Sequence, residues 1–223
     1  MYDLERARFN MIEQQIRPWE VLDPTVLDLL AAVRREDFVP PEHQALAFVD
    51  TQVPLGGGRF MLEPRVEARL LQELQPQRHE KVLEIGTGTG FMAALLGHRA
   101  QRVITLEPDA ALAVAAAHRL QRVGLANVTV RHLAATEAAH GLPAEAPFDA
   151  IVLSGSVHEV PRALLEQLKG GGRLAAIVGD EPVMRACLFT RATGGADGWS
   201  KAELFDTLAP RLPGFEPKPR FVF

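Results

Sequence analysis

The run from 82 to 90, VLEIGTGTG, has the clearest chemical meaning in this chain. Its apolar first half is typical of a short buried strand, and the apolar residues that follow at 91–96 predict a helix. A strand, a glycine-rich turn and a helix place backbone N–H groups and the positive end of a helix beside a ligand. Gly86, Gly88 and Gly90 permit positive φ angles and a close approach of the backbone. We therefore expect a ligand-binding turn here.

The spacing of the glycines indicates which ligand this turn binds. A dinucleotide fingerprint, G-x-G-x-x-G, needs its third glycine at position 91, where the chain has Phe91. A dehydrogenase is therefore a poor interpretation. The pattern E-x-G-x-G-x-G resembles the first motif of methyltransferases that use S-adenosylmethionine (SAM). This resemblance implies SAM as cofactor and S-adenosylhomocysteine (SAH) as product, with a purely structural turn as the alternative.

Two acidic residues strengthen the interpretation as a cofactor site. Glu107 ends the next predicted strand, about 20 residues past the glycines, where a carboxylate is placed to accept both hydroxyls of a ribose. The alternative for Glu107 is a solvated acid at a strand end or near a helix start. Glu84 lies inside an apolar strand, where an unpaired carboxylate would be costly to bury. Its expected partner is the ammonium of a bound methionine moiety or nearby N–H groups.

Length and composition fit one α/β domain with an extension. The chain has 223 residues, 47% of them hydrophobic and 23% charged, and its net charge of -4 argues against nucleic acid as a partner. No apolar run approaches the ~18 residues that span a bilayer, and the N-terminus lacks the apolar core of a signal peptide. The single cysteine, Cys187, is interpreted as a small buried hydrophobe. We expect a cytoplasmic protein with no membrane partner, and the sequence does not indicate its oligomeric state.

The first part of the chain, 1–79, predicts a helical extension and a glycine-rich loop. An apolar stripe from Leu4 to Ile16 predicts one helix. Asp23 and Pro24 begin a second, which the prolines at 40–41 stop. Residues 54–59, PLGGGR, predict a loop, and Pro64 begins a third helix.

The second part, 80–223, predicts the SAM-binding core. Strands are expected at 81–86, 102–107, 128–133, 148–154 and 173–178, with helices at 90–98, 109–122 and 161–168. Residues 183–193 and 200–208 flank a glycine-rich stretch and predict an antiparallel hairpin. The expected fold is α/β: a mostly parallel, seven-stranded, Rossmann-like sheet with helices on both faces.

With these elements placed, the chain resembles the protein-L-isoaspartate O-methyltransferase family over nearly its whole length. The resemblance rests on REDFVP at 35–40, FVDTQVPLG at 48–56, VLEIGTGTG at 82–90, PFDAIV at 147–152 and matches within 160–172. It implies methyl transfer from SAM to a carboxylate of isoaspartyl residues in damaged protein. It implies cofactor contacts from Glu84, Gly86, Thr87, Gly88, Gly90, Glu107, Leu133, Ala134 and Ser154. The implied substrate-side loop contains Val53, Pro54, Leu55, Gly57, Gly58, Arg59, Phe60 and Leu62.

The chain departs from the family where the acceptor is expected. The family reads Gln-Thr-Ile-Ser-x-Pro where this chain reads RFMLEP at 59–64, so Phe60 and Leu62 replace two hydroxyls that lie near the reacting carboxylate. The family's Gly-Asp-Gly near the adenine is LAA at 133–135, and its Thr-Ala-Ala is SGS at 154–156. No catalytic residue is therefore assigned.

Two side chains remain candidates at the acceptor. Arg59 can orient a carboxylate through two hydrogen bonds, or it is a solvated loop arginine. His158 follows the fourth core strand and can act as a base toward a hydroxyl or amine, or it is a surface histidine. No metal-ligand spacing is present among the histidines.

Three functions remain open from the sequence. The first is methylation of isoaspartyl protein or peptide, weakened by the missing hydroxyls. The second is a methyltransferase of the same fold with a small-molecule acceptor. The third is a SAM-binding protein that has lost catalysis, which the intact glycine turn and Glu107 disfavour.

Overall fold

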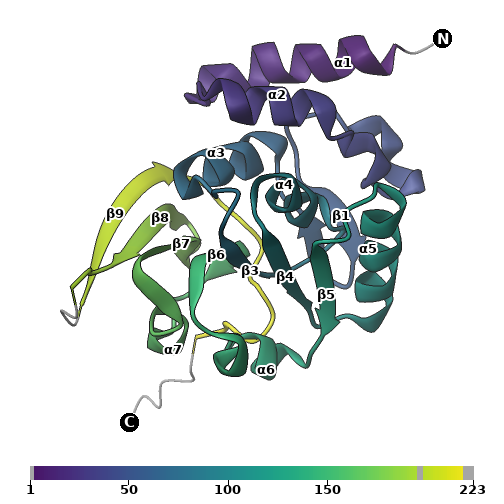
Figure 1. Ribbon diagram of the computed structural model, residues 1–223. Coiled ribbons are helices and arrows are strands. Elements are labelled where there is room, and N and C mark those ends of the chain that lie inside the picture. The colour runs from purple at the N-terminus through teal and green to yellow at the C-terminus, as the bar shows by residue number, and fades with distance from the viewer. Residues whose placement is uncertain (1–2, 195–197, 218–223) are drawn as a thin grey trace.

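A seven-stranded sheet forms the centre of the protein in a computed structural model that describes residues 3–194 and 198–217 (Figure 1). Its strands are β3 (Lys81–Ile85), β4 (Arg102–Glu107), β5 (Val128–His132), β6 (Phe148–Val157), β7 (Leu168–Asp180), β8 (Val183–Arg191) and β9 (Trp199–Asp206). The strand order is β5-β4-β3-β6-β7-β8-β9. The first five strands in this order pair in parallel, and β8 is antiparallel to β7 and to β9. The predicted sheet and C-terminal hairpin are confirmed, and residues 195–197 of its turn lie outside the described residues.

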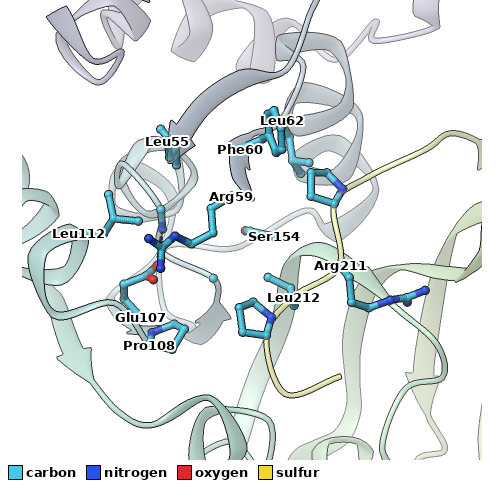
Figure 2. A pocket seen from close by; sticks show the side chains of 14 residues that line it. Leu55, Arg59, Phe60, Leu62, Glu107, Pro108, Leu112, Ser154, Arg211 and Leu212 are labelled. Carbon is cyan, nitrogen blue, oxygen red and sulfur yellow. Dashed lines mark hydrogen bonds between the residues drawn. The ribbon is translucent and has the colours of Figure 1, made fainter. Parts of the chain in front are cut away.

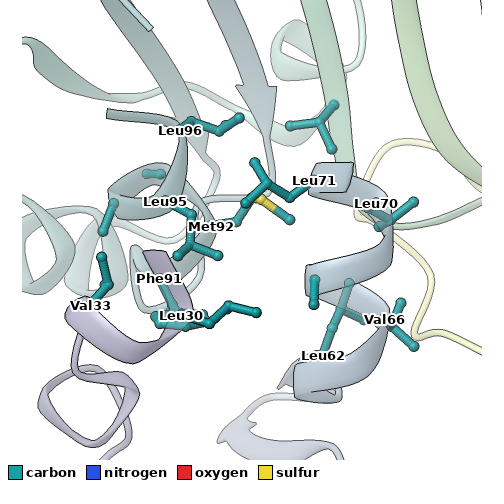
Figure 3. Close-up of a cluster of buried hydrophobic side chains, with 14 of the residues drawn as sticks. Leu30, Val33, Leu62, Val66, Leu70, Leu71, Phe91, Met92, Leu95 and Leu96 are labelled. Carbon is teal, nitrogen blue, oxygen red and sulfur yellow. The ribbon is translucent and has the colours of Figure 1, made fainter. Parts of the chain in front are cut away.

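Alternation of apolar residues along the strands explains why both faces of the sheet are covered. Val82 and Val103 face a cluster that includes side chains of α1–α4, part of which Figure 3 shows. Leu83 and Ile104 face a second cluster with α6 and α7. The helices are α1 (Leu4–Met11), α2 (Pro24–Ala32), α3 (Pro64–Leu74), α4 (Phe91–Arg99), α5 (Ala110–Arg122), α6 (Ala135–Ala138) and α7 (Arg162–Leu165). Helices on both faces are thus confirmed (Figure 1).

The N-terminal helices are shorter than the sequence predicts. After α1 the chain continues as a π-helical stretch (Ile12–Ile16) and a 3-10 turn (Arg17–Trp19). Helix α2 begins at the predicted cap, where Asp23 accepts from the backbone N–H of Thr25, but ends at Ala32 instead of at the prolines. One 3-10 stretch, Arg35–Asp37, lies between the end of α2 and the prolines, and two more lie at Pro41–Leu46 and Pro143–Glu145. The buried arginine Arg35 explains the early end, because its guanidinium binds Glu67 and the Leu62 carbonyl oxygen.

The predicted glycine-rich loop is a small hairpin, so this expectation was wrong. Strands β1 (Val53–Gly56) and β2 (Arg59–Met61) pair antiparallel, and Gly57 and Gly58 turn the chain at φ values of +58° and +75°. Two strands this short carry too little alternation to be recognised in a sequence.

Other boundaries differ for related reasons. Helix α7 is one turn long because β7 begins at Leu168 and runs through the glycines at 170–172. Strand β6 continues to Val157. Buried residues from 1–79 and from the core share one apolar cluster, and the division at residue 79 stays a prediction. Within the described residues, no helix is both long and apolar enough to cross a membrane.

Candidate active site

A cavity lies at the carboxyl ends of β3, β4 and β6 (Figure 2). This is the edge of a parallel sheet where ligands bind. Three parts of the chain line the cavity: the core turns, the β1–β2 hairpin, and the segment 210–213 that follows β9. The lining residues are Leu55, Arg59, Phe60, Leu62, Gly86, Gly88, Glu107, Pro108, Leu112, Ser154, Pro210, Arg211, Leu212 and Pro213.

The glycine turn forms the floor of the cavity. Gly86 and Gly88 have φ values of +96° and +52°, which disfavour any side chain. A Cβ atom built on Gly88 would point into open space, with only Leu55 Cδ1 nearby at 3.5 Å. Gly90 serves packing instead, because a Cβ there would contact Ala116 and Leu120 of α5 at 3.4 Å. Gly88 therefore leaves a cradle that a ligand can fill.

Glu107 lines the cavity beside Gly88, and its carboxylate can accept more hydrogen bonds than it already does. Its carboxylate accepts the backbone N–H of Gly88 at 2.7 Å and that of Asp109 at 3.1 Å, one bond to each oxygen. A carboxylate has about four lone-pair sites, so each oxygen can still accept a hydroxyl. Burial raises the pKa of Glu107, and the two N–H groups and the nearby Arg59 oppose that shift. With Pro108 and Leu112 alongside, the wall suits a ribose and an apolar ring face, which are parts of SAM.

Glu84 is fully buried below the turn and is held by hydroxyls. It accepts from Thr105 Oγ1 and from Ser154 Oγ, both at 2.7 Å. Thr87 is also buried and shares a 2.6 Å hydrogen bond with Thr105. Burial raises the pKa of Glu84 to about 8. The backbone N–H partners considered from the sequence are thus replaced by hydroxyls.

The side of the cavity that was expected to hold the acceptor is apolar. Phe60, 39% exposed, and Leu62, 3% exposed, both line it, at the positions where the family pattern has hydroxyls (Figure 2). Val53 and Pro54 of β1 pair with Met61 and Phe60 and support this wall. The substrate-side residues expected from the sequence are therefore brought together on one hairpin.

Arg59 does not extend toward this apolar wall. Its Nη1 forms an ion pair with Asp109 Oδ2 at 2.8 Å, and Figure 2 shows the guanidinium directed toward Glu107 and away from Leu62. Asp109 is also the N-cap of α5, since its Oδ1 accepts from the backbone N–H of Leu112 at 2.9 Å.

The sequence analysis did not identify two parts of the chain that form or support this cavity. The segment 210–213 lies along β6, where the Ser156 backbone N–H donates to the Pro210 carbonyl at 2.8 Å and the Leu212 N–H donates to the Ser156 carbonyl at 2.9 Å. It carries no motif, and its position depends on this long-range pairing. The second is Arg35, 1% exposed, which donates to the Leu62 carbonyl at 2.7 Å; a charged residue in REDFVP gives no local signal of burial.

Several predicted residues lie elsewhere. Leu133 and Ala134 are not among the lining residues, and Leu133 packs against the second apolar cluster. His158 is outside this cavity and forms a 2.6 Å contact with Asp180. Cys187 is buried as expected, and burial raises its pKa. Within the described residues, no group of three acidic, histidine or cysteine side chains could hold a metal ion.

Known proteins have sequences similar to this chain. The sequence model of a family described as protein-L-isoaspartate(D-aspartate) O-methyltransferase matches residues 6–201. Protein-L-isoaspartate O-methyltransferase 1 of Syntrophobacter fumaroxidans is 38% identical over 81% of this chain and 83% of its own. The enzyme of that name from Methylorubrum populi is 41% identical over 78% of this chain and 81% of its own.

Solved structures agree at the level of the fold. A protein-L-isoaspartate O-methyltransferase has a TM-score of 0.74 at 21% identity, covering 94% of this chain and 65% of that one. A Plasmodium falciparum protein described as the same enzyme, in complex with SAH, has a TM-score of 0.75 at 19% identity, covering 96% of this chain and all of that one. The family match includes the glycine turn, Glu107 and the β1–β2 hairpin. This chain belongs to the protein-L-isoaspartate(D-aspartate) O-methyltransferase family.

Proposed function

We propose that this chain transfers the methyl group of SAM to a carboxylate of isoaspartyl residues in damaged protein or peptide. Membership of the family confirms the O-methyltransferase class and the SAM cofactor expected from the sequence. The observation that carries the acceptor assignment is that one cavity is lined both by the glycine turn with Glu107 and by the hairpin that carries Phe60 and Leu62. A methyl donor and an acceptor can therefore meet there.

Methyl transfer to a carboxylate depends more on how the two reactants are positioned than on acid or base groups of the protein. SAM supplies a methyl group on a positively charged sulfur, from which a nucleophile takes it by in-line displacement. A carboxylate acceptor has a reference pKa of about 4 and is ionised at neutral pH, so the protein need not remove a proton. Orientation of bound reactants can contribute about 7 kcal/mol or more to lowering the barrier. Gly88 and Glu107 fix the cofactor side, and the hairpin shapes the acceptor side.

Phe60 and Leu62 favour one alternative acceptor. Neither side chain can donate a hydrogen bond to a carboxylate, so turnover on isoaspartyl peptides should be slow. An apolar wall instead suits a small-molecule acceptor with an apolar body beside its nucleophile. A cytoplasmic location and the absence of nucleic-acid and membrane partners stay predictions from the sequence.

One assay tests the proposal directly. We expect radiolabelled methyl transfer from SAM to a peptide with an isoaspartyl residue and none to the matched aspartyl peptide. Label on neither peptide, together with SAH binding by calorimetry, would instead support the small-molecule acceptor or a cofactor-binding protein without catalysis. Absence of SAH binding would contradict the cofactor assignment itself.

A further inference from the structure

An ion pair between β2 and the N-cap of α5 holds Arg59 at the cofactor side of the cavity. It begins β2 of the hairpin, and its Nη1 pairs with Asp109 Oδ2, which belongs to the cap of α5, at 2.8 Å. The two side chains are 32% and 24% exposed, so water screens the pair only in part. This ion pair joins the substrate-side hairpin to the end of the cofactor-side strand.

The hairpin turn is shaped to hold Arg59 in this position. A Cβ atom built on Gly57 would lie 3.0 Å from Arg59 Nη2 and 3.4 Å from Cζ. The guanidinium therefore rests against the bare face of Gly57, and a side chain at that position would push it away. Gly57 contributes this space as well as the positive φ of the turn.

The electrostatics also place Arg59 with the cofactor residues. The backbone N–H of Leu112 and the charge of Arg59 both lower the pKa of Asp109, and Arg59 also opposes the burial that raises the pKa of Glu107. Glu107 further accepts backbone N–H groups from Gly88 and Asp109, and in the parallel register of β4 and β5 it lies opposite His132. Arg59 is the cationic side chain that lines the cavity beside this carboxylate, whereas Arg211, from the opposite wall, binds Asp180 (Figure 2).

We propose that Arg59 is a cofactor-positioning residue, which through its ion pair with Asp109 holds the β1–β2 hairpin in place over the SAM site. The proposal rests on the proposed cofactor site and gives Arg59 a different role from orienting the acceptor carboxylate. If the hairpin is already held in place before the cofactor binds, binding does not have to order it. The entropy cost of that ordering is then avoided, and the affinity for the cofactor is higher. In this arrangement Arg59 does not offer its positive charge to an acceptor carboxylate at the apolar wall of Phe60 and Leu62.

The test measures SAH binding by calorimetry to the full chain and to Arg59→Gln. We expect the Kd for SAH to rise about threefold to tenfold, the scale of a partly exposed, charge-assisted pair. Asp109→Asn should give a similar rise, because asparagine caps a helix as well as aspartate does but cannot form the ion pair. The two changes together should cost little more than either alone.

Two readouts separate positioning from a general structural effect. The Kd of the wild type should rise with salt more steeply than that of Arg59→Gln. The variant's Kd should also rise more than that of the wild type as the pH is lowered, because Arg59 opposes the raised pKa of Glu107. Arg59→Lys should restore part of the affinity. Arg131→Gln is the matched control: its ion pair with Glu145 has side chains 34% and 25% exposed, and neither residue lines the cavity.

The outcomes distinguish the two proposals. Wild-type chain that binds no SAH overturns the cofactor site, and the role of Arg59 with it. Wild-type binding with an unchanged Kd in Arg59→Gln overturns the role of Arg59 alone. In that case a raised KM for an isoaspartyl peptide would assign Arg59 to the acceptor. Equal losses in Arg59→Gln and Arg131→Gln would also overturn the proposal.

Discussion

Glu107 allows the sharpest test of the cofactor site, because its two oxygens already have defined partners. Replacing it with alanine removes the proposed acceptor for the ribose hydroxyls. Losing the hydrogen bonds that a charged group accepts from a ligand costs about 1–3 kcal/mol when measured by deletion. We therefore expect Glu107→Ala to weaken SAH binding by about 1–3 kcal/mol, which is about fivefold to 150-fold in Kd.

The structure adds a second effect that the assay must separate. Glu107 is 2% exposed, and its removal leaves the N–H groups of Gly88 and Asp109 without their acceptor. An unpaired buried N–H costs about 1–3 kcal/mol, partly offset because the burial of a carboxylate is relieved. Glu107→Gln is the matched variant, since it fills the same space and keeps one acceptor oxygen. Its amide NH₂ must face one of the two N–H donors.

Calorimetric titration with SAH, accompanied by thermal melting of each variant, checks this reasoning. Weaker binding by a variant that still melts cooperatively above the assay temperature supports a ribose contact. An SAH affinity that is unchanged in both variants would show that Glu107 only organises the turn through Gly88 and Asp109. The ribose would then lie elsewhere.

Three further predictions follow from the same cavity. Gly88→Val should abolish SAH binding by filling the cradle, and it should also lower the melting temperature because valine is strained at a φ of +52°. Phe60→Thr combined with Leu62→Ser should raise turnover on an isoaspartyl peptide but not on its aspartyl control; no gain would argue against orientation by hydroxyls at these positions. Glu84→Gln should gain stability relative to wild type as the pH rises from 5 to 8. Burial raises the pKa of Glu84 in the folded protein to about 8, above the pKa of this group in the unfolded chain. The wild type therefore loses no stability at a pH below the unfolded pKa, and it loses progressively more as the pH rises from there toward the folded pKa. Melting curves at both pH values measure the difference, and a constant difference would contradict the shift.

The cofactor half of the site could be predicted from the sequence because its signals are local. Gly86 and Gly88 need positive φ angles, and the strand before them needs apolar neighbours, so a short run of residues reports both requirements. Glu107 follows from counting one helix and one strand further along a parallel sheet. In each case the chemistry and the geometry belong to the same stretch of chain.

The acceptor half could not be predicted in the same way, because its geometry depends on distant partners. Leu212 reaches the cavity through backbone pairing with Ser156, and Arg59 is directed by Asp109, which lies 50 positions later in the sequence. No periodicity connects such pairs. The family resemblance placed Leu133 and Ala134 near the cofactor, but neither lines the cavity, where Pro108 and Leu112 supply the apolar surface.

The loss of a hydroxyl at position 62 need not mean that the acceptor site has lost its shape. Arg35 donates to the backbone carbonyl of Leu62, and the same guanidinium binds Glu67 in the first turns of α3. Both contacts are independent of the side chain at position 62. The backbone from the hairpin into α3 is thus held in place while the side chain there can change. A serine introduced at this position would keep both backbone contacts but would remove a buried apolar side chain, so melting curves must accompany the turnover measurement on the combined variant.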